Sequence, residues 1–426
     1  MKKIIIASLC CSLFLTACSN NSWSEDVNMG EISEEEISIE TNIESTTESV
    51  AESEIESSQI SETISTDPVS SEEIKEEEKE GVLVSYYYYN QLESYEKDMY
   101  DKILDNLKSF NLETELKGIS MDSFYKIHTA LVYDNPDIFW ADSFTVSTLN
   151  DVPTKVKFNY EGEPEGDSME THIRANRILE NLPQGSRYEQ YKYIYEYIVN
   201  NTDYVAESKF NQDIRSVLIY GQSVCAGYAK TFQFLCDKAG LPCIYVSGIA
   251  KDGPHAWNMI ELENGKCYWC DVTWGDPIYE GENNNSINYN YFCVDDSVLI
   301  NSHTLDVGVT TNNAVLYDIW RYPDCEDNSY NYYRLKGCYF DTYDKAAIEN
   351  YLGTKIKNNE LSNIEMKFAN FDDFSAFIRD FMDGGENAYI FEVMKNNINS
   401  GWTNINYNYE YSENSFYAKI TFGITY

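Results

Sequence analysis

One stretch of the sequence decides the fold, Gly221-Gln222-Ser223-Val224-Cys225-Ala226-Gly227-Tyr228-Ala229. After Cys225 the apolar residues recur at helical spacing, at positions 229, 232, 235 and 236. Gly240, followed by Leu241-Pro242, ends this predicted helix. Cys225 is therefore expected at a helix N-terminus, where the positive end of the helix dipole favours a thiolate.

Two later segments carry the partners that a cysteine nucleophile needs. They are Pro254-His255-Ala256-Trp257-Asn258 and Asp271-Val272-Thr273-Trp274-Gly275-Asp276-Pro277. A nucleophilic thiol requires a base that takes its proton, and the base requires an acceptor that orients it. The three segments therefore predict Cys225 as nucleophile, His255 as base and Asp271 as the orienting carboxylate.

The histidine and the aspartate lie on two predicted strands, which are joined by a turn that contains Gly265. A two-residue turn would place Asp271 on the opposite face from His255, and the triad would fail. A three-residue loop, with Gly265 in the left-handed conformation, pairs Leu262 with Lys266 and puts the two side chains diagonally on one face. The catalytic interpretation thus requires the three-residue loop.

Together the patterns S-V-C-A-G-Y-A, G-L-P-C, H-A-W-N and D-V-T-W-G-D-P resemble the transglutaminase-like superfamily, in its bacterial secreted branch, over roughly residues 83–305. The resemblance implies the same roles for Cys225, His255 and Asp271, and a papain-like core in which a helix packs on an antiparallel sheet. The superfamily includes amine-acyl transferases, peptidases, amidases and members without activity. The chain has no acidic loop with calcium-ligand spacing, so no metal and no cofactor are expected.

The expected fold class is α+β, with a transglutaminase-like domain at residues 83–309. This domain begins with a mainly helical lead-in, which ends near residue 165 and packs against the papain-like core. Residues 310–426 are expected to form a second, small α+β domain. Its predicted elements are helices near 343–352 and 374–381, a strand at 364–368 and a C-terminal hairpin.

The first 17 residues have the shape of a secretion signal, because Lys2 and Lys3 precede a short apolar run that closes with Leu15-Thr16-Ala17. The next residue, Cys18, completes a bacterial lipobox pattern and is the expected site of lipid attachment. We therefore expect a lipid-anchored protein on the extracellular face of the bacterial cell membrane. The alternative is a plain signal peptide with an incidental cysteine.

Residues 18–82 are expected to form a disordered, acidic tether. Residues 19–80 hold 20 acidic side chains against Lys75 and Lys79, and few apolar ones. Such a segment cannot bury enough apolar surface to fold, and its charges repel one another. The formal net charge of the whole chain is −40, which argues against a nucleic-acid partner.

The sequence leaves the reaction itself partly open. Protein or cell-wall peptides are the expected substrates, and water or a primary amine would resolve the acyl-enzyme, with hydrolysis favoured. The backbone N–H of Cys225 is one expected oxyanion donor, and either Gln222 or Tyr204 is the second. The alternative function is a catalytically silent binding or scaffold module of the same fold.

Several other chemistry-bearing residues are expected to be structural. Cys267 and Cys270 have the C-x-x-C spacing of a zinc or redox motif, but residues three apart on a strand face opposite sides. They are interpreted as packed small residues. His128 and His303 lack a suitably spaced cysteine or aspartate and are assigned structural or surface roles.

Overall fold

The computed structural model describes residues 2–7, 83, 85–251, 253–276, 287–306, 308–310, 315–316 and 319–426. Side chains are not described for residues 2–7, 310, 315–316 and 386. The predicted tether and the predicted lipidation site, Cys18, lie outside these residues and stay predictions.

The elements follow in chain order. Helices α1 to α11 span Tyr87–Asn90, Ser94–Lys108, Met121–Asp134, Pro164–Leu179, Arg187–Asn201, Cys225–Ala239, Asp296–Leu299, Tyr332–Leu335, Lys345–Lys357, Phe371–Phe377 and Ile390–Asn397. Strands β1 to β17 span Lys2–Ala7, Glu113–Glu115, Phe144–Leu149, Val152–Phe158, Asp203–Tyr204, Gln222–Ser223, Cys243–Ala250, Gly253–Glu261, Cys267–Cys270, Phe292–Val294, His303–Leu305, Val309–Thr310, Val315–Leu316, Tyr339–Phe340, Ile364–Phe368, Asn404–Ser412 and Tyr417–Thr425. Short 3-10 turns lie at Phe139–Ala141, Thr273–Gly275 and Gly385–Asn387, and π turns at Ser216–Tyr220 and Ile378–Met382.

Part of the predicted secretion signal is described in this structure of the full chain. Strand β1 pairs antiparallel with β3, so that Lys2 lies opposite Leu149 and Ala7 opposite Phe144. Removal of a signal is a processing event, and it stays a prediction. Of the helices in the described ranges, none combines the length and apolarity that a membrane span requires.

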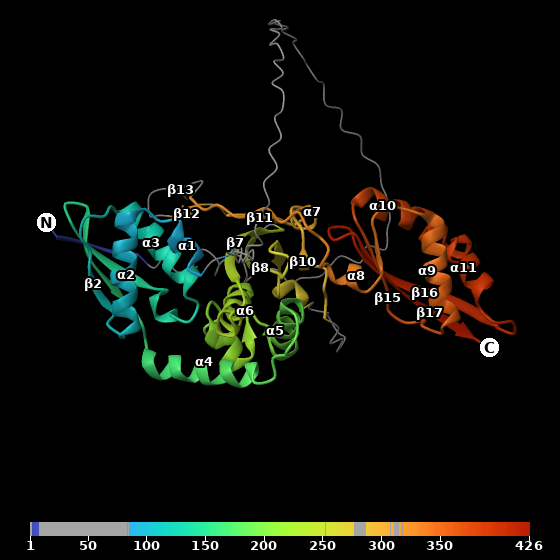
Figure 1. The fold of residues 1–426 in the computed structure, drawn as a ribbon, viewed down its shortest axis with the longest axis horizontal. Helices are drawn as coiled ribbons and strands as arrows, with labels where there is room; N and C mark the ends of the chain where they lie inside the picture. The colour runs from blue at the N-terminus through green and yellow to red at the C-terminus, as the bar shows by residue number, and fades with distance from the viewer. Residues whose placement is uncertain are drawn as a thin grey trace, which may run out of the picture. The chain divides into compact units, whose positions relative to one another are not determined.

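The central sheet has five strands in the order β10-β9-β8-β7-β11, and every neighbouring pair is antiparallel. Helix α6 packs on β7 and β8 (Figure 1). The side chain of Asn258 ties the two layers together, because its Nδ2 donates to the Ala229 carbonyl of the helix over 3.0 Å. The expected α+β fold, with a helix packed on an antiparallel sheet, is confirmed.

The hairpin between β8 and β9 has the register that the catalytic interpretation requires. Glu261 lies opposite Cys267, and the Leu262 N–H donates to the Lys266 carbonyl over 3.1 Å. Gly265 has a φ of 67°, in the left-handed region that glycine adopts without strain. The three-residue loop is therefore confirmed.

The lead-in contains a sheet that the sequence interpretation left out. Helix α3 ends at Asp134, ahead of Asn135-Pro136, as predicted. After it, β3 and β4 form a hairpin that joins β1 and β2 in the order β1-β3-β4-β2. The hairpin buries Phe144 and Val156 in the same core as helices α2 and α3. The lead-in is thus mixed rather than mainly helical.

The C-terminal region has a hydrophobic core of its own, formed by residues between Ile348 and Phe422. Its sheet has the order β14-β15-β17-β16, and the predicted C-terminal hairpin is β16–β17. Residues up to Cys338 still belong to the first core, and the predicted domain boundary at residue 310 stays a prediction.

One predicted helix end in this region is wrong. Helix α9, expected near 343–352, does not end before Gly353 but continues to Lys357. A Cβ at Gly353 would lie 2.7 Å from Oδ1 of Asn397, at the end of α11. The glycine therefore allows α9 and α11 to pack closely, and it does not terminate the helix.

Candidate active site

Cys225 is the first residue of helix α6, as the sequence predicts. Strand β6 delivers the chain to this point, and Val224 precedes the helix in an extended conformation. The cysteine is 2% exposed and packs against Ala226, Ala229 and Ala256. The same cluster includes Tyr245, with Tyr133 packed against it, and the free N–H groups of the first helical turn lie beside the cysteine.

The structure brings the three predicted catalytic residues together. His255 Nε2 lies 2.7 Å from Asp271 Oδ2, and the Asp271 side chain is fully buried. The backbone N–H of Trp274 donates to the other carboxylate oxygen over 3.1 Å. Cys225 lies close enough to His255 to help raise its pKa, and Nδ1 is the ring nitrogen that does not contact Asp271. This is the connectivity of a nucleophile, a base and an orienting acceptor.

The charges of the site follow from its burial and its pairing. Burial disfavours the charged form of His255, but the negative charges of Asp271 and Cys225 outweigh it and raise the histidine pKa to about 10. Burial acts to raise the pKa of Asp271, yet its pairing with His255 holds that pKa well below the usual range. At neutral pH the site therefore holds an imidazolium beside a carboxylate.

His303 also belongs to this site, which the sequence interpretation missed. Its Nε2 lies 3.1 Å from the same Asp271 Oδ2, and its side chain is fully buried. The assignment of a structural or surface role assumed that no aspartate was near. Strand β11, which begins at His303, pairs with β7 at one edge of the sheet, whereas the preceding strand β10 lies at the other edge. The sequence spacing between Asp271 and His303 does not indicate that the chain crosses from one edge of the sheet to the other between β10 and β11.

The three side chains His255, Asp271 and His303 form a group that a metal ion could use, with ligand atoms all within 4.8 Å of one another. Their contacts of 2.7 and 3.1 Å are hydrogen-bond distances. A metal would also have to displace the proton of His255, whose pKa is about 10. The geometry therefore fits two N–H donors on one carboxylate better than a metal centre.

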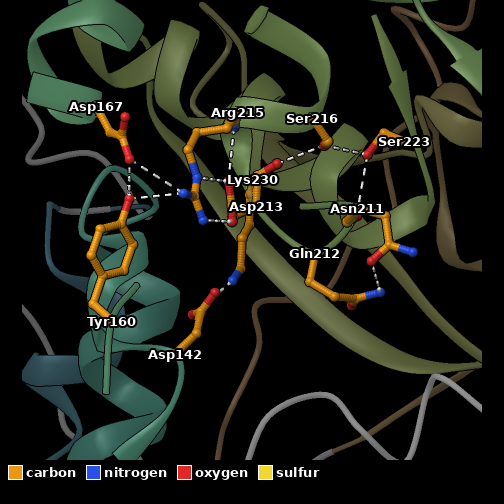
Figure 2. A network of polar contacts seen from close by, with 10 residues as sticks. All are labelled: Asp142, Tyr160, Asp167, Asn211, Gln212, Asp213, Arg215, Ser216, Ser223 and Lys230. Atoms are coloured by element: carbon orange, nitrogen blue, oxygen red, sulfur yellow. Dashed lines mark hydrogen bonds and ion pairs between the residues drawn. The ribbon is translucent and has the colours of Figure 1, made fainter. Parts of the chain in front are cut away.

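A buried polar network holds the segment that leads to Cys225 (Figure 2). Ser223 Oγ lies 2.6 Å from Ser216 Oγ, which donates to the Asp213 carbonyl over 2.7 Å. The Asp213 carboxylate pairs with the Arg215 guanidinium, with Nη2 and Oδ2 separated by 2.7 Å. A Cβ at Gly227 would lie 2.0 Å from Ser223 Oγ, so only glycine fits inside the first turn of α6 at this contact. The network thus fixes the approach of β6 to the helix.

The two candidate oxyanion side chains lie on neighbouring short strands just ahead of Cys225. Strand β5 pairs parallel with β6, so that Asp203 lies opposite Gln222 and Tyr204 opposite Ser223. Gln222 is exposed, and Tyr204 is half-buried. Either role stays a prediction.

The cysteine motif behaves as the structural interpretation expects. Cys267 and Cys270 lie on β9 and belong to different hydrophobic clusters, on the two faces of the sheet. All eight cysteines in the described part of the chain are buried free thiols. Cys225 is thus distinguished by its neighbours, His255 above all.

Part of this chain is similar to known proteins. Residues 175–273 match the transglutaminase-like superfamily. The kyphoscoliosis peptidase of Mus musculus is 24% identical over 182 residues, which cover 38% of this chain and 27% of the relative. The Homo sapiens protein of the same name is 28% identical over 109 residues, covering 22% and 16%. This chain therefore spans about a quarter or less of the length of these relatives. A solved structure described as a TGase covers 33% of this chain and 46% of its own, with 15% identity and a TM-score of 0.25.

Proposed function

We propose that this protein is a lipid-anchored, cell-surface cysteine enzyme that cleaves or transfers amide bonds. The observation that supports it most is the triad of Cys225, His255 and Asp271, in which His255 Nε2 lies 2.7 Å from Asp271 Oδ2. The transglutaminase-like match of residues 175–273 includes all three residues.

The geometry supports a specific course of events. The Cys225 thiolate attacks the carbonyl carbon of an amide, and the C–N bond breaks as the His255 imidazolium gives its proton to the leaving amine. The product is a thioester on Cys225, with His255 neutral. Water or a primary amine then attacks the thioester while His255 takes the proton, which regenerates the thiolate–imidazolium pair. Asp271 keeps the imidazole oriented and stabilises its charge throughout.

Hydrolysis is the favoured outcome, because water is abundant outside the cell and dedicated amine donors are few. Incubation with a glutamine-containing peptide and a labelled primary amine tests this choice. We expect free ammonia or cleaved peptide to exceed incorporated label at millimolar amine, and neither product with Cys225→Ala. Label incorporation that exceeds hydrolysis would assign the protein as a transferase instead.

The proposed location rests on the sequence, where Lys2, Lys3 and the apolar run lead to Cys18. We expect the wild-type chain in the membrane fraction of a bacterial host and Cys18→Ala in the soluble or secreted fraction, because the thioether-linked lipid is lost. Cys338→Ala is the matched control, since it removes a buried cysteine far along the chain. Equal membrane association of wild type and Cys18→Ala would refute lipid anchoring.

The second candidate function is a catalytically silent binding module, and one observation favours it. Cys225 is only 2% exposed and His255 only 6% exposed. A substrate can therefore reach them only if some of the side chains that cover them move. Covalent labelling of Cys225 by a thiol probe separates the two functions.

A further inference from the structure

Asp271 accepts hydrogen bonds from two histidines, and the triad chemistry uses only one of them. His255 Nε2 and His303 Nε2 lie 2.7 and 3.1 Å from the same oxygen, Oδ2. Oδ1 is occupied separately by the Trp274 N–H. The carboxylate is thus held on both oxygens, and His303 supplies the contact that the proposed reaction does not require.

The surroundings of His303 select one protonation state. Burial lowers its pKa, and the hydrogen bond to Asp271 offsets this only in part, while the charge of His255 lowers it further. The ring packs on Trp257, Trp274 and Tyr291, with centroid separations of 4.8, 4.5 and 5.3 Å. An apolar aromatic cage of this kind disfavours a second imidazolium beside the first.

The contact with Asp271 selects the tautomer of His303, and the partner of the other ring nitrogen is compatible with it. His303 Nδ1 lies 2.8 Å from Ser302 Oγ, which in turn lies 2.9 Å from the Tyr291 hydroxyl. If Nε2–H donates to Asp271, Nδ1 must accept, so the Ser302 hydroxyl donates to it. The titratable or charged groups around His303 are Asp271, His255 and Tyr291, with Lys251 over the Trp274 ring at 5.4 Å.

We propose that His303 is a positioning residue of this site, a neutral Nε2–H donor that fixes the position of the Asp271 carboxylate. Its hydrogen bond also weakens the electrostatic stabilisation that Asp271 gives to the His255 imidazolium. The proposal deepens the proposed function and rests on it for its catalytic meaning. The positive end of the His303 N–H bond points at the oxygen that binds His255. It therefore opposes the imidazolium slightly, and it keeps His255 acidic enough to protonate a leaving amine.

The matched variants are His303→Phe, which keeps a ring in the aromatic cage but removes the donor, and His303→Gln, whose amide N–H can replace Nε2–H. His128→Gln is the control, because His128 is also buried and lies 2.8 Å from the Ala141 carbonyl, on helix α3 outside the triad. The chain has four histidines, so ring nitrogen spectra of the ¹⁵N-histidine-labelled full chain can be assigned by single substitutions.

In these spectra we expect His303 to be neutral, with its proton on Nε2, while His255 carries both ring protons at pH 7.5. His303→Phe should raise the titration midpoint of His255, and His303→Gln should return it towards the wild-type value. A protonated His303, a proton on Nδ1, or an unchanged midpoint in His303→Phe would overturn the proposal. The spectra need no substrate, so this result is independent of whether the proposed function holds.

Activity gives the second readout, if the protein hydrolyses amides. His303→Phe is expected to lower kcat/KM about tenfold or more, the size expected when a hydrogen bond to a charged group is lost. His303→Gln should restore most of this activity, and His128→Gln should affect only stability. Equal losses in His303→Phe and His303→Gln would indicate a purely structural role.

Discussion

Replacing Asp271 with asparagine is expected to lower kcat/KM for amide hydrolysis about 10³- to 10⁴-fold. An asparagine removes the negative charge that stabilises the His255 imidazolium, and its amide group can hold the ring in the wrong tautomer. Because the carboxylate is fully buried and 2.7 Å from Nε2, water cannot replace it.

The same variant should change the pH dependence of the rate. The imidazolium form of His255 is present below its pKa of about 10 and is lost as the pH rises through that value. The alkaline limb of the wild-type profile is therefore expected near pH 10. With Asp271→Asn the burial of His255 is no longer offset by this charge, so the limb should move to lower pH. A limb that stays in place would contradict the assigned pairing.

Asp142→Asn is the matched control for this variant. Asp142 also carries a partly buried carboxylate, but it pairs with Lys230 Nζ over 3.2 Å in the network of Figure 2 and does not contact His255. We expect it to change stability without moving the alkaline limb. A similar shift in both variants would indicate a general electrostatic effect rather than a specific pair.

Replacing Cys225 with alanine is expected to have the largest effect, a loss of kcat of about 10⁶-fold, which leaves only background turnover. In the proposed reaction the thioester forms on this sulfur, and an alanine side chain offers no nucleophile in its place. Cys236→Ala is the control, because Cys236 is fully buried on the same helix α6. It should leave the rate constant of the chemical step close to that of wild type.

The core of the site was predictable from sequence because local rules determine it. The helical spacing after Cys225 sets the helix start, and Gly265 sets the hairpin loop. Together they fix which faces His255 and Asp271 occupy, before any long-range contact is known. The hydrogen bond of 2.7 Å is the consequence.

The β3–β4 hairpin was missed although its signal is present. Leu149 lies opposite Val152, so Asn150 and Asp151 form a two-residue turn, with φ values of 52° and 64°. Asparagine and aspartate tolerate the left-handed conformation that such turns require. The interpretation of this region as mainly helical gave this turn too little weight.

His303 could not have been found in this way. Its position depends on the order of strands in the sheet, in which consecutive β10 and β11 lie at opposite edges. The chain crosses between them through α7, and no periodicity in the sequence specifies where it ends. A site residue whose position depends on such a crossover connection can be identified only from the tertiary structure.

The central claim is that Cys225 is a nucleophile activated by His255, and covalent labelling tests it most directly. The full-length protein is treated with an electrophilic thiol probe at pH 6, and the modified peptides are identified by mass spectrometry. We expect labelling at Cys225 alone among the eight buried thiols that the structure describes, and a strong loss of labelling in His255→Ala. Equal labelling of wild type and Cys225→Ala would contradict it.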